Sequence, residues 1–291
     1  MFPSFMRLSS MAPSSGTLFV VATPIGHRED ISARALDTLR TVQLIAAEDT
    51  RNSGLLMQHY GIRTPLTALH EHNERSVSAT LIQKLQSGLS VALISDAGTP
   101  AISDPGALLV EDALAQGIRV VPIPGPSAVT TLLSVSGFSA RHFFFYGFLP
   151  VKAGARGREL ESLKGLQATL VFYEAPHRIR DCLAALAEVL GGERRIVIGR
   201  ELTKLFETVH RTTLAEALLW IDADPNHQRG EFVLAVEGAQ QPADEDPARH
   251  DALLLALLEK LSVGDTVRIA MQITGTGRKM LYERALKLTQ G

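Results

Sequence analysis

The chain has 291 residues, of which 45% are hydrophobic and 21% are charged. This length and composition suit one large α/β domain or two compact ones, and they exclude an intrinsically disordered chain. The formal net charge of −2 gives no overall attraction to nucleic acid, so any binding to RNA must depend on local basic patches.

Short apolar runs alternate with amphipathic stretches through the first half of the chain. The apolar runs predict strands at residues 17–22, 44–47, 66–69, 91–95, 118–123 and 142–146. The amphipathic stretches predict helices at residues 32–41, 53–60, 74–86, 105–116 and 127–136. Such alternation is typical of a parallel or mostly parallel sheet with helices on both faces. We therefore assign residues 16–148 to an N-terminal α/β domain.

The second half of the chain begins with a change in composition. Residues 149–158 (LPVKAGARGR) combine proline, glycine and basic residues, so we interpret them as a linker. Residues 159–239 predict a second α/β domain, with strands at 169–173, 195–199 and 231–236 and helices at 176–190 and 213–220. Residues 240–247 are acidic and contain proline, which indicates a second linker.

The last segment, residues 248–291, predicts a small helical domain with helices at 252–261, 267–273 and 278–288. Its last helix carries four basic residues, Arg278, Lys279, Arg284 and Lys287. They fit either an ordinary solvated helix face or a helix-turn-helix-like unit that contacts RNA phosphates.

The start of the chain and its single cysteine bear on where the protein works. Residues 1–16 hold one arginine and no apolar run, so they do not form a signal peptide. We expect residues 1–15 to be a disordered tail, with Met11 as an alternative start. Cys182 is the only cysteine, which excludes an internal disulfide and fits a reducing compartment. With no apolar run of about 18 residues to span a membrane, we expect a cytoplasmic protein.

The loops after the first five predicted strands are rich in glycine, proline and polar residues: TPIG, EDTR, HEHN, SDAGTP with ISDP, and PGPS. In open α/β sheets, ligands bind beyond the carboxyl ends of the strands, so five such loops at one edge predict a binding site. No Gly-x-Gly-x-x-Gly follows a strand and no P-loop occurs, which disfavours NAD and ATP. Glycine- and proline-rich loops that lack a phosphate cradle fit S-adenosylmethionine. We expect no metal site, because His70 and His72 alternate on an extended segment and would face opposite ways.

Eight strings, in this order, resemble the RsmI family of the tetrapyrrole-methylase superfamily: VATPIGHREDIS, AAEDTR, HEHNE, LISDAGTPAISDPG, VVPIPGPSA, GFLP, FYEAPHR and RELTK. The resemblance runs from about residue 16 to residue 237 and is weaker in the helical tail. It implies two α/β domains with S-adenosylmethionine in the cleft between them, a small helical C-terminal extension, and a homodimer. It also implies 2′-O-methylation of a cytidine ribose in the decoding region of 16S rRNA, within the 30S subunit.

The resemblance also implies which residues hold the cofactor. The superfamily has a Gly-Asp-Pro string after the fourth strand, whereas this chain has Gly98, Thr99 and Pro100, so Asp96 or Thr99 is expected to take a local role. The predicted cofactor-binding residues are Pro24, Gly26, Asp96, Ala97, Gly98, Thr99, Ile102, Ser103, Ser127, Ala128, Tyr173, Glu174 and Leu202.

Methyl transfer requires alignment of the two reactants, and a base or a cation near the ribose oxygen assists it. The catalytic candidates are Glu48, Asp49, His70, Glu174 and Lys204, and the sequence does not identify the base among them. Two structural alternatives stand beside these roles. Glu48 or Asp49 would cap the following helix, and Lys204 would form a surface ion pair with Glu201.

The predicted RNA-binding residues are Arg51, Lys152, Arg156, Arg158, His177 and Arg178. His177 and Arg178 begin a predicted helix, where the helix dipole disfavours cations unless an anion lies nearby. As alternatives, Arg51 would pair with Asp49 and the linker residues would be solvated.

Two other functions remain open from the residues. One is methylation of a small porphyrin-like molecule, and the other is a non-catalytic RNA-binding assembly factor. The strings EDTR, HEHN and FYEAPHR favour the RNA branch of the superfamily.

Overall fold

The computed structural model describes residues 15–139, 141–240 and 247–290. The predicted tail at 1–15 and the predicted linker at 240–247 lie outside the described residues, except for residues 15, 240 and 247. The chain divides into two compact units, Met1–Gly238 and Ala239–Gly291. The first unit contains two five-stranded sheets, and the second is helical.

The first sheet is parallel throughout, as the alternation of strands and helices predicts. Its strand order is β3-β2-β4-β1-β5, and every neighbouring pair is parallel. All five strands therefore end at the same edge, which brings the loops that follow them together. The strands are β1 (Thr17–Val21), β2 (Leu44–Ala47), β3 (Leu66–Ala68), β4 (Val91–Ile94) and β5 (Arg119–Ile123).

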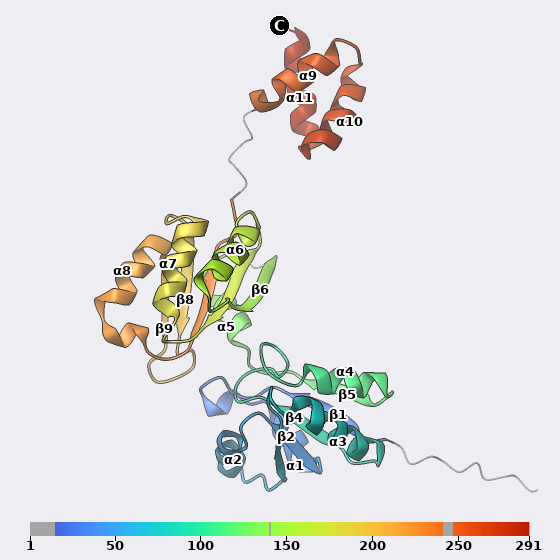
Figure 1. Ribbon diagram of the computed structural model, residues 1–291, viewed down its shortest axis with the longest axis vertical. Helices are drawn as coiled ribbons and strands as arrows, with labels where there is room; N and C mark the ends of the chain where they lie inside the picture. The colour runs from blue at the N-terminus through green and yellow to red at the C-terminus, as the bar shows by residue number, and fades with distance from the viewer. Residues whose placement is uncertain (1–14, 140, 241–246, 291) are drawn as a thin grey trace, which may run out of the picture. The chain divides into compact units, whose positions relative to one another are not determined.

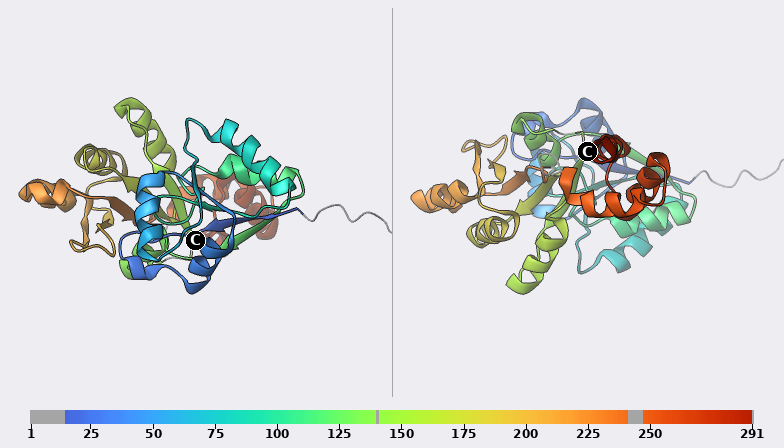
Figure 2. Two further views of the ribbon diagram at one scale, coloured as in Figure 1. Left: turned by 90° about the horizontal axis from the view of Figure 1, so that it is seen from below. Right: turned by 90° about the horizontal axis from the view of Figure 1, so that it is seen from above.

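Helices cover both faces of the first sheet (Figures 1 and 2). Successive strand residues point to opposite faces, so Ile94 is buried with Leu39 on one face and Leu93 with Leu85 on the other. The first core contains side chains of α1 and α2, and the second contains side chains of α3 and α4. These helices are α1 (Ala33–Thr41), α2 (Thr50–His59), α3 (Glu74–Gln86) and α4 (Ala107–Ala115).

The second sheet is mixed, with the order β6-β7-β10-β8-β9. β6 is parallel to β7, and the other three pairs are antiparallel. One face packs against α6 (Ala153–Leu163), α7 (Ile179–Leu190) and α8 (Leu214–Ala223), and the other packs against α5 (Ala128–Ser136). The strands are β6 (Phe143–Phe148), β7 (Thr169–Glu174), β8 (Arg195–Arg200), β9 (Thr208–Thr213) and β10 (Phe232–Val236).

The sixth predicted strand belongs to the second sheet, so the end of the assigned N-terminal domain, residues 16–148, needs correction. β6 pairs with β7 and not with any strand of the first sheet. The reason lies in α5, which follows β5 but packs against β7, β8 and β10 through side chains such as Leu132 and Leu133. The chain has thus already crossed to the second sheet before β6 begins.

Two further elements differ from the sequence prediction. Helix α6 occupies the second half of the predicted linker 149–158, because burial of Leu160 and Leu163 outweighs the low helix propensity of Gly154 and Gly157. Strand β9 was not predicted, since its sequence TVHRTT includes only one apolar side chain. It forms an edge strand that is hydrogen-bonded only to β8.

In its described part, the second unit holds three α-helices, α9 (Asp251–Leu258), α10 (Val263–Thr274) and α11 (Arg278–Gln290), around Leu254, Val267 and Leu281. Within the basic last helix, the Arg284 guanidinium donates to the Asp251 carboxylate at 2.7 Å, so this arginine ties α11 to α9. Arg278, Lys279 and Lys287 are exposed. None of the described helices has the length and apolar character that crossing a membrane requires.

Candidate functional site

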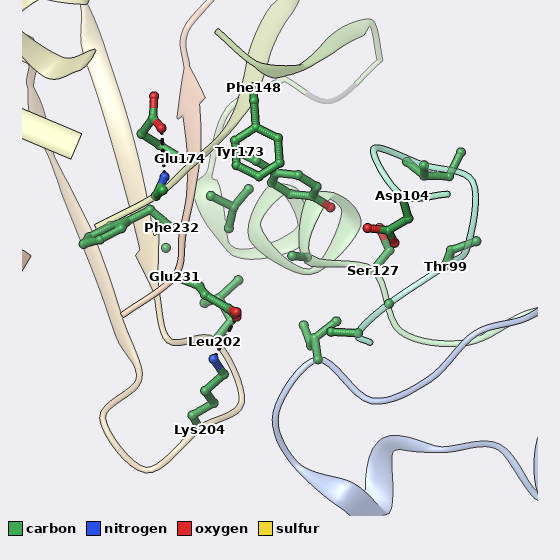
Figure 3. A pocket seen from close by; sticks show the side chains of 18 of the residues that line it. Thr99, Asp104, Ser127, Phe148, Tyr173, Glu174, Leu202, Lys204, Glu231 and Phe232 are labelled. Carbon is green, nitrogen blue, oxygen red and sulfur yellow. Dashed lines mark hydrogen bonds and ion pairs between the residues drawn. The ribbon is translucent and has the colours of Figure 1, made fainter. Parts of the chain in front are cut away.

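A cavity of about 380 Å³ lies between the loops at the carboxyl edge of the first sheet and the facing surface of the second (Figure 3). Both sheets contribute to its wall. Of the predicted cofactor residues, those that line it are Ala97, Gly98, Thr99, Ile102, Ser127, Ala128, Tyr173, Glu174 and Leu202. Pro24, Gly26, Asp96 and Ser103 lie in or beside the same loops but outside the lining.

The loops after β1 and β4 are locked together at the cavity wall. The N–H of Thr23 donates to the carbonyl of Gly98 at 2.9 Å, and the N–H of Gly98 donates to the carbonyl of Thr23 at 3.0 Å. Gly98 has a backbone φ of +82°, a conformation that residues other than glycine rarely adopt. Gly26 has a different role, because a Cβ there would lie 2.5 Å from Cγ of Lys204. It allows the loop after β8 to approach the first sheet.

Backbone strain is concentrated in the two loops that meet at the cavity. Among the described non-glycine residues, positive φ occurs at Ala101 (66°), Ser103 (63°), Glu201 (51°) and Thr203 (64°). Each such residue costs about 1–3 kcal/mol and persists only where the surroundings enforce it, which is typical of binding sites. Ser103 and Ala101 therefore shape the loop after β4, although neither lines the cavity.

Glu48, Asp49 and Asp96 form a hydrogen-bonded junction between the ends of β2 and β4. The N–H of Asp49 donates to Oδ1 of Asp96 at 3.0 Å, and the N–H of Asp96 donates to Oε2 of Glu48 at 3.4 Å. Asp49 caps α2, accepting from the N–H of Arg51 at 2.8 Å, which supports the structural alternative for Asp49. Burial is the main cause that raises the pKa of Glu48 above its ordinary value.

Asp104 is a half-buried carboxylate that lines the cavity, and the sequence prediction did not include it. Burial is the main cause that raises its pKa to about 6. A hydrogen bond from Ser95 opposes this rise, and the negative charges of Glu48 and Asp96 add to it. Figure 3 shows its carboxylate facing the hydroxyl of Tyr173 across the cavity. Burial and the charge of Asp104 raise the pKa of Tyr173 to about 12.

The Glu174 carboxylate does not face the cavity, so a catalytic role for this side chain is wrong. Its side chain is fully buried, and its Oε1 lies 3.0 Å from Nε of Arg178 and accepts from the N–H of Ala175 at 2.8 Å. Figure 3 shows it directed away from Asp104 and Ser127. Residue 174 borders the cavity, but its charged carboxylate lies beside Arg178 and does not reach the cavity.

Arg156 is buried and the Arg178 side chain is only 16% exposed and paired with Glu174, which argues against their predicted contact with RNA. The Arg178 guanidinium pairs with Glu174 and donates to the carbonyl of Leu149. Arg156 is 7% exposed and is one of the buried residues of α6. Both lie near the buried thiol of Cys182, whose pKa burial and the Glu174 carboxylate raise. Arg178 compensates the charge of Glu174, because an unpaired buried carboxylate would be costly.

Lys204 lies in the middle of the loop that connects β8 to β9 and lines the cavity. Its Nζ donates to Glu201 at 3.0 Å and to Glu231 at 2.8 Å, so the predicted ion pair with Glu201 is present. Burial opposes protonation, but these hydrogen bonds and charges outweigh it and raise the pKa of Lys204. The ammonium therefore stays charged and can serve as a cation, not as a base.

The remaining candidates lie outside the cavity lining. His70 follows β3, where its N–H donates to Asn73 Oδ1 at 2.9 Å and its Nδ1 is buried without a hydrogen-bond partner in the described chain. Arg51 is 89% exposed and pairs with Asp49 at 3.0 Å. Exposed side chains are also found at Lys152, Arg158 and His177. Within the described residues, no group of His, Cys, Asp and Glu side chains could hold a metal ion.

The sequence prediction missed several of the lining residues, and among them are Asp104, Phe148 and Glu231. Asp104 lies in the ISDP string after β4, so the position of that loop was its only signal. Phe148 and Glu231 lie at a strand end and beside a strand of the second sheet, where strands run both ways and the carboxyl-edge rule does not apply.

Comparison of the chain with known proteins identifies a family that it matches. Residues 17–218 match the model of the Tetrapyrrole (Corrin/Porphyrin) Methylases, and residues 244–289 match the model of the RsmI C-terminal HTH domain. The chain is 52% identical to a Pseudomonas aeruginosa protein named ribosomal RNA small subunit methyltransferase I, over 94% of this chain and 98% of that one. The protein of the same name from Escherichia coli O157:H7 is 47% identical over 94% of this chain and 96% of that one.

Solved structures share the fold at much lower identity. A diphthine synthase aligns with a TM-score of 0.59 at 15% identity, covering 76% of this chain and 90% of that one. The methyltransferase CobJ aligns with a TM-score of 0.58 at 18% identity, covering 77% of this chain and 95% of that one. These likenesses support the two-sheet architecture.

The buried pair gives a test that separates a role of Arg178 in the fold from one on the surface. Arg178→Ala leaves the Glu174 carboxylate buried without its cation, so we expect a loss of about 3–5 kcal/mol in the free energy of unfolding. Urea denaturation measures this loss. His177→Ala, at the exposed neighbouring position, is the matched control and should stay within about 0.5 kcal/mol of wild type. Equal stability of the two variants would contradict a structural role for the pairing of Arg178 with the buried Glu174 carboxylate.

Proposed function

Because the chain belongs to the RsmI family of tetrapyrrole methylases, and is therefore an S-adenosylmethionine-dependent methyltransferase, we propose that it methylates a cytidine ribose 2′-hydroxyl in the decoding region of 16S rRNA. The observation that carries this proposal is similarity along nearly the whole chain to proteins named ribosomal RNA small subunit methyltransferase I. We further propose that the substrate is the RNA within the 30S subunit, and that the enzyme is a cytoplasmic homodimer.

We assign the cofactor to the cavity between the two sheets. Its volume of about 380 Å³ is in the range of small-molecule sites. Ile102 and Leu202 offer apolar walls, and the backbone of Gly98 borders the space without a Cβ. The residues proposed to contact the cofactor are Ala97, Gly98, Thr99, Ile102, Ser127, Ala128, Tyr173 and Leu202. Pro24, Gly26, Asp96 and Ser103 would hold these loops from behind.

The cofactor supplies, when bound, a methyl group on a positively charged sulfur. The chain contributes mainly alignment of the ribose with that methyl group, and alignment accounts for about 7–11 kcal/mol in well-oriented reactions. Lys204 keeps its charge at the cavity wall, where a cation would stabilise negative charge that develops on the ribose oxygen. We propose no proton transfer through Glu174 or Asp49, because the first is paired with Arg178 and the second caps α2.

The RNA would approach through exposed basic side chains. Lys152 is the N-cap residue of α6, Arg158 lies in the middle of that helix, and Arg51 lies in the first turn of α2. In the second unit, Arg278, Lys279 and Lys287 are exposed on α11. Local clusters of this kind are needed because the chain as a whole carries a net charge of −2.

The reaction can be tested with isolated 30S subunits and cofactor labelled in its methyl group. We expect label in 16S rRNA at one cytidine, with the adjacent phosphodiester made resistant to alkali because its 2′-oxygen is blocked. The matched control is Gly98→Val, which forces a β-branched residue into a φ of +82° at the cavity wall and should abolish cofactor binding. Label on a base, or no label with wild type and intact subunits, would contradict the proposal.

Salt dependence tests the proposed binding of RNA by exposed basic side chains. Removing one side chain that binds a phosphate should lower the slope of log affinity against log salt by roughly 0.7–0.9. We expect this change for Arg158→Ala, with the melting temperature unchanged, because the side chain is exposed. Lys84→Ala removes one exposed charge from α3 and serves as the control. An equal slope for Arg158→Ala and wild type, measured on 30S subunits, would remove Arg158 from the interface.

A further inference from the structure

The cavity has four charged side chains in its lining: Asp104, Glu174, Lys204 and Glu231. The charges of three of these side chains are already balanced by ion pairs within the protein. Glu174 is paired with Arg178 outside the cavity, and Lys204 and Glu231 are hydrogen-bonded to each other at 2.8 Å. Asp104 differs from these, because no cationic side chain in the described part of the chain makes an ion pair with it. One negative charge therefore faces the cavity without a counter-charge.

The surroundings of Asp104 increase the cost of that charge. The charges that act on Asp104 are those of Glu48 and Asp96, and both are negative. His70 acts on Glu48, whose own pKa is raised. Tyr173 faces it from β7, and its phenol stays neutral. A carboxylate held in this setting is stabilised by a cationic ligand, since opposite charge is the interaction that its protein neighbours do not provide.

Aromatic rings form the wall beside Asp104. Phe148 and Tyr173 both line the cavity, with ring centroids 5.7 Å apart and planes inclined at 59°. Aromatic faces attract cations, and they suit alkylated cations that do not need hydrogen-bond acceptors. An ammonium group, by contrast, needs up to three acceptors. The combination of one carboxylate with two aromatic rings thus favours an alkylated cation such as a sulfonium.

We propose that Asp104, Phe148 and Tyr173 form a site for the sulfonium of S-adenosylmethionine, and that this site makes the enzyme prefer the charged methyl donor over the neutral product S-adenosylhomocysteine. This inference rests on the proposed placement of the cofactor in the cavity. The donor and the product carry the same ammonium, carboxylate and adenosine groups, so the sulfonium charge and its methyl group are all that distinguishes them. Loss of that charge on reaction would weaken binding of the product and favour its release.

The test is calorimetric binding of S-adenosylmethionine and S-adenosylhomocysteine to wild type and Asp104→Asn. We expect the affinity for the donor to fall about ten- to hundredfold, the range for loss of one charge-assisted interaction. The affinity for the product should change less than about threefold. Asp37→Asn is the matched control, because its side chain is 77% exposed on α1, and it should leave both affinities unchanged. Equal losses for the two ligands in Asp104→Asn would overturn the proposal.

A second pair of variants tests the aromatic part of the site. Phe148→Leu should lower the ratio of donor to product affinity, because it removes the ring and keeps an apolar side chain. Phe144→Leu is its control: Phe144 is on the same strand, is 41% exposed and lies outside the cavity lining. An unchanged ratio in Phe148→Leu would exclude the ring from the site.

The wild-type protein provides a test that does not depend on the folding of a variant. The ionised form of Asp104 is the one that binds the cation, and its pKa without ligand is about 6. Donor affinity should therefore be constant above pH 7 and fall as the pH is lowered through 6, by at most about tenfold per pH unit, whereas product affinity should not follow it. Parallel pH profiles for the two ligands would contradict the proposal.

The Gly98→Val variant distinguishes failure of this inference from failure of the cavity assignment. If Gly98→Val abolishes binding of both ligands while Asp104→Asn leaves their ratio unchanged, the cofactor occupies the cavity and the sulfonium site is wrong. If Gly98→Val binds both ligands as wild type does, the cavity assignment fails and the sulfonium site fails with it.

Discussion

The packing of helix α5 on the second sheet determines the rest of the ligand-binding geometry. α5 follows the last strand of the first sheet, yet its buried residues Val129, Leu132 and Leu133 pack against β7, β8 and β10. The fit is close at Gly199, where a Cβ would lie 2.8 Å from Cδ1 of Leu132. Because interiors are close-packed, such packing fixes the orientation of the two sheets within this unit.

The cavity and its strained loops follow from that orientation. With α5 on the second sheet, its N-cap residue Ser127 and its first residue Ala128 line the cavity together with Leu202. The loop after β8 then meets the loop after β1, where the N–H of His27 donates to Oγ1 of Thr203 at 3.0 Å. That hydrogen bond helps to hold Thr203 at its positive φ. Strain in the loops is thus supported by contacts from the opposite sheet.

The first sheet could be predicted from sequence because buried parallel strands are short apolar runs and each is followed by a helix. The carboxyl-edge rule then located Gly98, Thr99 and Ser127. β6 could not be assigned in this way, since an apolar run does not indicate which of two sheets it joins. The second sheet also contains antiparallel pairs, so the rule carried no information about Phe148 or Glu231.

Charged side chains were the least predictable part of the site. Arg156 was assigned to RNA because it lay in a predicted linker, and Arg178 because it began a predicted helix, but Arg156 is buried in α6 and Arg178 pairs with the buried carboxylate of Glu174. The spacing of four residues between Glu174 and Arg178 was visible in the sequence as an ion-pair spacing, although Glu174 ends strand β7 and Arg178 precedes the first residue of α7. Asp104 was not predicted, because the sequence does not show that the charged groups around this carboxylate in the folded chain are negative.

Hydrogen exchange of the whole protein, with and without S-adenosylmethionine, tests most directly whether one ligand binds to both sheets. A cofactor held in the cavity should protect backbone amides in two groups at once: residues 97–103 and 127–129 beside the first sheet, and residues 173–175 and 199–204 in the second. Protection confined to the loops of one sheet, with the other sheet unchanged, would contradict a binding site built from both.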